Sequence, residues 1–324
     1  MSRLNRASGL TLALGLLLLQ TGCASLPFGG SEKFDAASQA KRIRQQQDMR
    51  AAADANTAPL EPITLEDRLH RGDLLRSSGD YAGAMWHYLQ AHEQGPQDSA
   101  PITRMASLHL LSDPRQAESM FRKLVGEHPE NGAAHTGLGL ALIERQDWTA
   151  ARETLTHAVA LSSQSAAAHS ALGVCLDQLG EHGGARAAYL NATTLHPHYY
   201  EALNNLGVSY LTTEEFDAAA EALRRASQQQ ERDPAVFNNL GLALGRLGRY
   251  DEALAAFRKG GAEQAARNNL GFVHYLNGSY DRAIEEYERA LLVDGDQRLL
   301  VLRNLRAAKR AKQESHASAK AGRS

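Results

Sequence analysis

A tetrapeptide that returns at nearly regular intervals constrains this 324-residue chain more than any other feature. Asn-Asn-Leu-Gly occurs at residues 204–207, 238–241 and 268–271, so the first interval is 34 residues and the second is 30. Internal repeats with periods of a few tens of residues are typical of architectures in which each unit packs mainly against its neighbours. The chain is therefore expected to form a long array of similar units.

The repeated unit extends well beyond the tetrapeptide. Each unit has a small residue, an apolar residue three positions later, then Gly or a polar residue, an aromatic residue and an Ala. Seven such units can be aligned over residues 65–297. Abundant Ala and Leu, with only nine Pro, favour helices over strands. The small residues let the two helices of a unit approach closely, and the aromatic residues fill the next interface. The first unit contains Gly72, Leu75, Gly79, Tyr81, Ala84, Tyr88 and Ala91.

This pattern resembles the tetratricopeptide (TPR) repeat, whose consensus contains L-G-x-x-Y, then A-x-x-x-F, then P. The resemblance implies an all-α fold, a TPR α-solenoid of about seven helix-turn-helix repeats with a C-terminal capping helix. A plain helical bundle would not keep a register of 33–34 residues over so many units. The 30-residue interval removes close to one helical turn of 3.6 residues. We therefore expect the second helix of the sixth unit to be shortened around Gly260-Gly261, a pair that ends helices, with the same face still directed inward.

The two ends of the array differ from its repeats. Residues 298–312 place apolar side chains on one side and Arg and Lys on the other, which predicts a capping helix that closes the core and leaves its outer face in water. Residues 313–324 are predicted to be a disordered basic tail. Before the array, residues 23–64 lack the repeat and are expected to be a linker. A polar helix within it is interpreted either as a tether or as a partner-binding helix.

Residues 1–22 have the organisation of a bacterial signal peptide. Two arginines precede an apolar run of 11 residues, about half the roughly 20 that a membrane-spanning helix needs. The run ends in Leu-Leu-Gln-Thr-Gly-Cys, which resembles a lipobox, although Gln20 stands where the motif prefers Leu. The resemblance implies that Cys23 is lipidated, for example with palmitate, and anchors the chain in the outer membrane facing the periplasm, because Ala rather than Asp follows it. Ordinary cleavage that leaves Cys23 as a plain thiol is the alternative.

No catalytic or cofactor-binding motif is present in the sequence. His135 and His169 recur at one repeat position and are assigned to the scaffold, and His196-Pro-His198 has no Cys or carboxylate at metal-ligand spacing. Cys175 lies in an apolar stretch and is expected to be a small buried residue rather than a reactive thiol. The net charge of −2 gives no reason to expect nucleic acid. We therefore expect a non-enzymatic protein without a metal or cofactor.

The first helix of each unit carries the candidate binding residues. In TPR proteins the second, fifth, ninth, twelfth and thirteenth residues of a unit line a concave groove, and the resemblance transfers these roles to the matching positions here. Amide side chains both donate to and accept from a peptide backbone, and an apolar stripe would take the side chains of an extended segment or a helix. The predicted peptide-binding groove contains Asn204, Asn238 and Asn268 at fifth positions, Val208, Leu242 and Phe272 at ninth positions, and Leu211 and Tyr275 at twelfth positions.

The fifth-position asparagines have a second interpretation, in which they are solvated surface. The adjoining Asn205, Asn239 and Asn269, at the sixth position, are common in the family and are expected to support neighbouring helices. A carboxylate clamp, which chaperone-binding TPR proteins use, is not expected. The groove positions that would need Lys or Arg hold residues such as Ala235 and Ala265.

A lipobox followed by a TPR array resembles three groups of outer-membrane TPR lipoproteins. These are the TadD family of tight-adherence (Tad/Flp) pilus assembly lipoproteins, the type IV pilus pilotins that help secretins assemble, and NlpI-like adaptors for periplasmic proteases. Residues 237–291, with the shortened unit, look most like the first group. The resemblance implies a scaffold that docks pilus or secretion components through its groove. An adaptor that presents a protease or a cell-wall hydrolase to its substrates stays open as the alternative.

Overall fold

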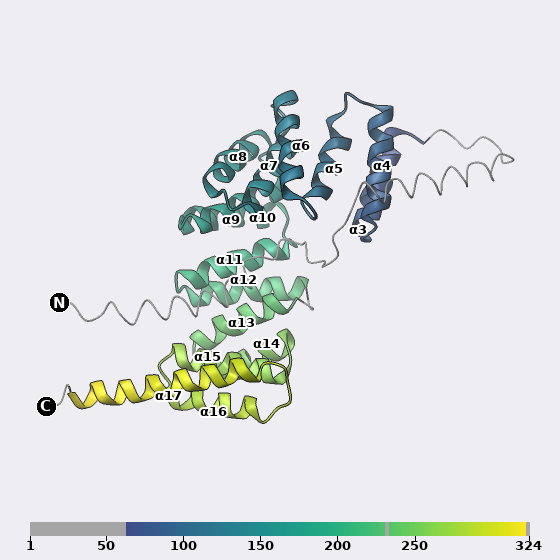
Figure 1. Ribbon diagram of the computed structural model, residues 1–324. Coiled ribbons are helices and arrows are strands. Elements are labelled where there is room, and N and C mark those ends of the chain that lie inside the picture. Colours follow the sequence, from purple (N-terminus) through teal and green to yellow (C-terminus); the bar gives the residue numbers. More distant parts are fainter. Residues whose placement is uncertain (1–62, 231–232, 322–324) are drawn as a thin grey trace, which may run out of the picture. The chain divides into compact units, whose positions relative to one another are not determined.

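The computed structural model describes residues 63–230 and 233–321, with 318–321 described in the backbone only (Figure 1). These residues form fifteen α-helices, and no strand occurs among them. The predicted signal peptide, Cys23 and nearly all of the linker lie outside the described residues. The helices are α3 (Leu65–Ser77), α4 (Tyr81–Gln94), α5 (Ser99–His109), α6 (Pro114–Glu127), α7 (Gly132–Glu144), α8 (Trp148–Leu161), α9 (Ala166–Gln178), α10 (His182–Leu195), α11 (Tyr200–Thr212), α12 (Phe216–Gln229), α13 (Pro234–Arg246), α14 (Tyr250–Gly260), α15 (Glu263–Leu276), α16 (Tyr280–Leu291) and α17 (Arg298–Ala321).

Fourteen of these helices follow one another as seven helix-turn-helix pairs, and α17 comes after the last pair. We call the first helix of each pair helix A and the second helix B. The described helices divide into two compact units, α3–α9 and α10–α17. Within each unit every helix packs against the next one, and most A helices also contact the next A helix. The predicted all-α repeat fold is therefore confirmed. No helix in the described ranges is both long and apolar enough to span a membrane.

Short polar side chains begin many of the helices. Asp98, Asp113 and Asp233 each accept a hydrogen bond from a backbone N–H in the first turn of α5, α6 and α13. Thr64 and Asp67 form a capping box at the start of α3, in which each side chain accepts from the backbone N–H of the other. These bonds satisfy N–H groups that have no partner inside the helix.

The turn inside most pairs places one residue in the left-handed backbone region. Four pairs have Gly there, with φ between 71° and 85°. The α7–α8 turn instead has Gln146, with φ 60°, and the α11–α12 turn has Glu214, with φ 63°. A side chain in this region costs about 1–2 kcal/mol per residue, because Cβ approaches the following carbonyl oxygen. These two turns are therefore strained, and the helices packed on either side hold them in place.

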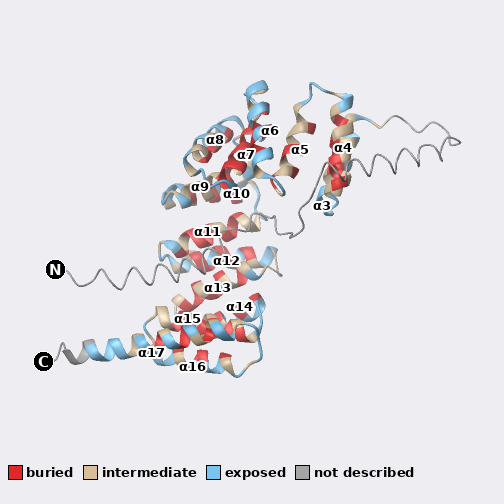
Figure 2. Cartoon of the chain, in the orientation of Figure 1, coloured by how far each residue is buried: buried red, intermediate tan, exposed pale blue. Residues whose placement is uncertain are grey.

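Small residues of helix A face large residues of helix B, as the repeat pattern predicts. A Cβ atom added to Gly271 in α15 would lie 2.8 Å from the ring of Tyr287 in α16. The same contact joins Gly72 to the ring of Tyr88 in the first pair. Both tyrosine side chains are fully buried, and the buried residues run along the contacts between successive helices (Figure 2). Each unit thus has a core that extends along the stack instead of closing around one centre.

The shortened repeat has the form predicted from its 30-residue interval. Helix α14 has 11 residues and ends at Gly260, whereas the preceding helix B, α12, has 14. Only Gly261 and Ala262 separate α14 from α15. A Cβ on Gly260 would lie 3.0 Å from the carbonyl oxygen of Pro234 and 2.8 Å from the Asn238 Oδ1 atom, so the close approach of α14 to α13 requires Gly there.

The C-terminal helix is longer than predicted. A capping helix was expected over 298–312 with a disordered tail after it, but α17 continues to Ala321. It packs against α16, where Val301, Leu305 and Ala308 are buried with Tyr287. Residues 313–321 are mostly Ala, Lys, Gln and Glu, which are good helix formers. Extending an existing helix needs no new nucleus, so intrinsic propensity prolongs α17 beyond its packed part.

Replacing Gln146 by Gly is expected to stabilise the protein against urea by about 0.5–1 kcal/mol. The substitution relieves left-handed strain of about 1–2 kcal/mol, less the 0.5–1 kcal/mol that a Gly loses in chain entropy. The reverse change at the equivalent turn, Gly180→Gln, is the matched control and should lower the urea midpoint followed by circular dichroism. Equal midpoints for all three proteins would contradict the assigned strain.

Candidate protein-binding groove

Pairs of asparagine side chains connect the A helices of the α10–α17 unit. Asn239 of α13 donates from Nδ2 to Oδ1 of Asn204 in α11 at 3.0 Å. Asn269 of α15 donates in the same way to Asn238 of α13 at 3.3 Å. The last pair joins α17 to α15, because the Nδ2 atom of Asn304 lies 2.9 Å from the Oδ1 atom of Asn268. We call these three hydrogen bonds the asparagine ladder.

The ladder changes the interpretation of the predicted groove asparagines. In each pair the acceptor occupies the fifth position of one repeat, and the donor comes from the next A helix. Asn204 and Asn268 are only 2% and 5% exposed, whereas Asn238 is half-buried. The sixth-position Asn239 and Asn269 support a neighbouring helix, as expected. Asn238 is therefore the fifth-position amide that combines a place in the ladder with an open surface.

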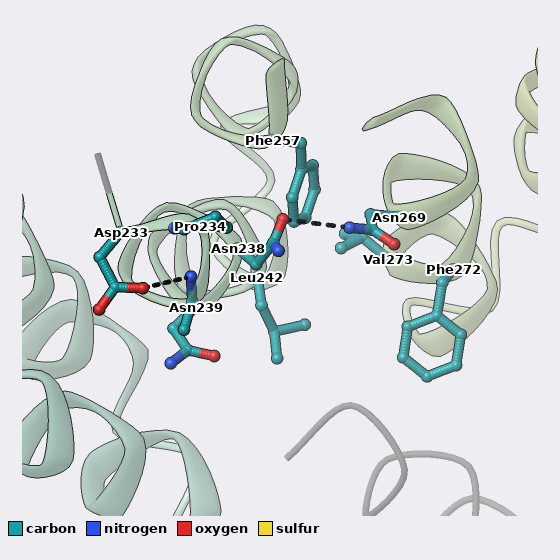
Figure 3. A pocket seen from close by; sticks show the side chains of 10 residues that line it. Asp233, Pro234, Asn238, Asn239, Leu242, Phe257, Asn269, Phe272 and Val273 are labelled. Atoms are coloured by element: carbon teal, nitrogen blue, oxygen red, sulfur yellow. Dashed lines mark hydrogen bonds between the residues drawn. The ribbon is translucent and has the colours of Figure 1, made fainter. Parts of the chain in front are cut away.

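Two adjoining cavities lie beside the ladder. The first, of about 330 Å³, lies between α13 and α15, and the second, of about 450 Å³, lies between α15 and α17. Asn238, Asn269 and Phe272 line both cavities, so the two form one continuous depression, which we call the asparagine groove. Figure 3 shows Leu242 and Phe272 extending to the same side of α13 and α15, beside the Asn238–Asn269 hydrogen bond. Amides and apolar side chains thus alternate along its wall.

The shortened repeat keeps the groove open. Gly260, Gly261, Ala262 and Ala265 line the α15–α17 cavity, and none has a side chain larger than a methyl group. At the far wall, the buried Gln264 accepts from the backbone N–H of Gln297 at 2.9 Å and donates to the carbonyl oxygen of Val293 at 3.0 Å. These bonds fix the loop between α16 and α17. The cavity is therefore built into the structure, with a rigid wall on one side and small residues on the other.

Few charged groups lie at the groove. The carboxylate of Asp233 caps α13 by accepting from the backbone N–H of Ala235 at 2.9 Å. Asp296 and Arg303 line the α15–α17 cavity, and neither forms an ion pair with another described residue. Arg267 of α15, by contrast, pairs with Glu263 and Glu286 away from the groove. Arg303 is thus a cation at the groove that is available to a ligand.

The other predicted groove residues lie outside the two cavities. Val208 and Leu211 of α11 are 3% and 8% exposed, and Leu211 belongs to a hydrophobic cluster shared by α11–α15. Tyr275 packs beneath α17 and stacks edge-on against Tyr280 at 5.7 Å between ring centroids. Burial raises the pKa of the Tyr275 hydroxyl, and the nearby Tyr280 and Glu314 raise it further. The binding role predicted for these three residues stays a prediction.

Several groove residues were not singled out from the sequence. Asn304 and Arg303 come from the capping helix, which the repeat alignment did not treat as an A helix. The signal was nevertheless present, because Asn304-Leu305 repeats the Asn-Leu of the tetrapeptide 35 residues after Asn269-Leu270. By this alignment Arg303 occupies the fifth position, which three earlier A helices fill with Asn. Helix α17 therefore aligns with the A helices and takes the place of an eighth one.

His135, His169 and Cys175 behave as scaffold residues. The ring nitrogen Nε2 of His135 lies 3.0 Å from the carbonyl oxygen of Pro129, and His169 makes the equivalent contact one repeat later. Cys175 is fully buried, its Sγ donates to the carbonyl oxygen of Trp148, and burial raises its pKa to about 11. Such a thiol is almost entirely protonated at neutral pH and is therefore a poor nucleophile. No group of three or more His, Cys, Asp or Glu that could hold a metal ion occurs among residues 63–230 and 233–321.

The fold and the groove together define a class of protein, the helical-repeat solenoid that presents a groove along its A helices. Two TPR family models match the chain, one over residues 108–175 and the other over residues 176–236, 204–264 and 238–298. The matches are continuous from 108 to 298 and cover more than half of the sequence. The chain belongs to the tetratricopeptide repeat family. No curated protein sequence matches it significantly.

Solved structures give the same fold at low sequence identity. The Cut9–Hcn1 hetero-tetramer of APC/C aligns with a TM-score of 0.54 and 18% identity, covering 84% of this chain and 53% of that chain. PilF of Pseudomonas aeruginosa aligns with a TM-score of 0.51 and 20% identity over 64% of this chain and 95% of its own. A thermophilic TPR protein of Thermus thermophilus shares 23% identity at a TM-score of 0.49, over 56% of this chain and 99% of its own. At these identities the first two similarities show the fold and nothing about function.

Replacing Asn304 by Ala is expected to destabilise the α10–α17 unit by about 1–3 kcal/mol, because the buried Oδ1 atom of Asn268 loses its donor. Urea denaturation measures the effect. The double variant Asn268→Leu/Asn304→Leu is the control, since replacing both partners by apolar groups of similar shape leaves no polar atom unsatisfied. It should be closer in stability to the unmodified protein than the single variant. If the double variant is less stable than the single variant, the Asn268–Asn304 hydrogen bond does not account for the predicted loss of stability.

Proposed function

We propose that this chain is a non-enzymatic scaffold that binds a segment of another protein in the asparagine groove. The observation that carries the proposal is the pair of adjoining cavities beside Asn238, Asn269 and Phe272. The free amide hydrogens there can bond to a peptide backbone, while Phe272 and Leu242 can receive apolar side chains. Grooves that combine a few polar groups with an apolar floor are typical of peptide recognition by helical-repeat proteins.

The preformed cavity wall favours this function over a purely structural role. Binding costs free energy whenever loops and side chains must become ordered. Here the α16–α17 loop is already fixed by Gln264, and the ladder holds the A helices in register. A partner segment would therefore meet a groove whose shape does not depend on the partner. Asn204, which is buried and bonded to Asn239, contributes to this rigidity and not to direct contact.

We further propose that the scaffold is lipid-anchored through Cys23 at the outer membrane and faces the periplasm. The lipobox-like run that ends at Cys23 supports the anchor, and Ala in the following position supports the outer membrane. The resemblance of residues 237–291 to the TadD family supports a role in Tad/Flp pilus assembly. In that role the groove would dock a pilus or secretin component.

Two alternatives stay with this proposal. The chain could be a periplasmic adaptor for a protease or cell-wall hydrolase of the NlpI-like kind, or a pilotin for a type IV pilus secretin. The gene neighbourhood distinguishes them. A secretin, a secretion ATPase and a small pilin beside this gene favour Tad/Flp assembly, whereas a gene that stands alone favours the adaptor.

Filling the groove is expected to abolish partner binding. Ala265→Trp places an indole in the α15–α17 cavity, where the native side chain is a methyl group. Ala255→Trp adds the same group to an exposed position of α14 and serves as the matched control. Proteins captured by the unmodified chain after crosslinking in cells should be lost with Ala265→Trp and retained with Ala255→Trp. If both variants retain the same partners, binding does not use the groove.

Replacing Cys23 by Ser is expected to release the protein from membranes, because the serine hydroxyl does not accept the lipid that lipobox processing attaches to a cysteine thiol. Each buried CH₂ of an acyl chain contributes about 0.8 kcal/mol, so losing the chains removes the anchor. Fractionation of cells that express each form measures the result. Continued sedimentation of Cys23→Ser with the outer membrane would contradict lipid anchoring.

A further inference from the structure

Arg303 occupies the fifth position of the repeat pattern, where α17 differs from the three preceding A helices. The fifth position holds Asn in α11, α13 and α15, and each of these asparagines accepts a hydrogen bond from the next A helix. No A helix follows α17 in the described chain, so a fifth-position Asn there would have no such donor. The residue is instead Arg303, which is exposed and lines the α15–α17 cavity.

Two more arginines, Arg306 and Arg310, follow Arg303 along α17. A helix turns by about 100° and rises about 1.5 Å per residue. Arg310 therefore lies about 20° from Arg303 around the axis and about 10 Å farther along it, and Arg306 lies between them about 60° away. All three are exposed and have no ion-pair partner among the described residues. We call these three residues the arginine stripe.

Three other cations of α17 have partners within the fold. Lys309 pairs with Glu288 of α16 at 2.9 Å, and Lys312 pairs with Asp281. Arg298 donates to the carbonyl oxygen of Leu291. The stripe is thus distinguished from the rest of a basic helix, because its three guanidinium groups are not used in holding α17 against α16.

Along the chain of α17 and the loop before it, acidic residues lie at the two ends of the stripe, and Glu288 of α16, beside its middle, is paired with Lys309. Asp296 lies in the loop before α17, seven residues before Arg303. Glu314 follows Arg310 by about one helical turn. The middle of the stripe therefore attracts anions. It is also continuous with the groove, since Leu300, Arg303 and Asn304 line the α15–α17 cavity together.

From this continuity we infer that the segment bound in the asparagine groove is acidic at the end that reaches α17. This inference rests on the proposed function and specifies the chemistry of the partner. Apolar side chains of the segment lie beside Phe272, and its backbone contacts Asn238. Carboxylates that follow them in the segment lie against Arg303, Arg306 and Arg310. Arginine forms bidentate bonds with carboxylates, so three of them in line specify an acidic run.

A protein segment fits these features better than an anionic membrane surface. A helix that lies in a membrane interface needs an extended apolar face beside its cations. On the exposed face of the stripe only Leu299, 84% exposed, supplies such a contact. The first arginine of the stripe belongs to a cavity, which a flat lipid surface does not enter. The membrane is therefore one of the alternatives that the experiment must distinguish.

The test uses the full chain with Cys23→Ser and an array of 15-residue synthetic peptides. The peptides vary Leu, Phe, Val and Tyr in the apolar half and carry three Glu, three Gln or three Lys in the other half, in both orientations. The Glu set should bind about tenfold more tightly than the Gln set in 50 mM salt, and the difference should shrink in 0.5 M salt, because screening weakens exposed ion pairs. The Lys set should bind most weakly.

Three variants test which residues cause the preference for Glu peptides over Gln peptides. Arg303→Gln/Arg306→Gln/Arg310→Gln should bind the Glu and Gln sets equally. A control with the same loss of charge, Arg115→Gln/Arg225→Gln/Lys259→Gln, changes exposed residues outside α17 and should keep the tenfold preference. Ala265→Trp should bind none of the peptides. Thermal melting of each variant confirms that it is folded.

The possible results separate this inference from the proposed function. If the Glu and Gln sets bind equally and Ala265→Trp abolishes both, the groove binds peptides and the acidic specificity is wrong. If the Glu set binds Ala265→Trp as well as the unfilled protein, the groove itself is not the site and both statements fail. Absence of binding to all sets also overturns both. Loss of binding to phosphatidylglycerol vesicles, but not to peptides, in the triple arginine variant would assign the stripe to the membrane.

Discussion

Packing of each helix against only its nearest neighbours is the constraint on which the rest of this structure depends. The close contact between Gly271 and the ring of Tyr287, which recurs between Gly72 and Tyr88 and between Gly241 and Phe257, lets two helices share one apolar surface. A pair made in this way leaves a second apolar surface uncovered, which the next pair must bury. Order therefore propagates along the chain, and α17 buries the second apolar surface of the last pair, where Val301, Leu305 and Ala308 pack with Tyr287 and Ala290.

The asparagine ladder fixes the register of the packed helices. Apolar contacts between repeated helices would tolerate small shifts along their axes, whereas a buried amide pair tolerates few, since an unsatisfied amide costs about 1–3 kcal/mol. Asn268 and Asn304 thus fix the register of α17, and Asn204 and Asn239 fix that of α13. The same pairs place Asn238 and Phe272 at the edge of two cavities. One set of side chains therefore sets both the geometry of the stack and the shape of the groove.

Local patterns predicted the fold well, because TPR packing is short in range. Gly72, Tyr88 and their equivalents identified the helix pairs, the Gly260-Gly261 pair marked the shortened helix, and the recurrence of His135 and His169 assigned them to the scaffold. The end of α17 was predicted wrongly, since a polar composition does not distinguish a disordered tail from a helix that continues beyond its packed part. Arg303 was overlooked as a groove residue because α17 was treated as a cap instead of an eighth A helix.

The amino-acid sequence by itself determined the repeat and the number of helix pairs, since these follow from the spacing of small and aromatic residues. Only the tertiary structure decided that Asn238 and Asn268 would be acceptors in the ladder and that the adjoining Asn239 and Asn269 would be donors. That choice depends on the offset between successive A helices, which results from packing over some thirty residues. The offset also left Asn238 half-buried. Unlike the fifth-position asparagines of α11, α13 and α15, Arg303 has no following A helix beside it among the described residues.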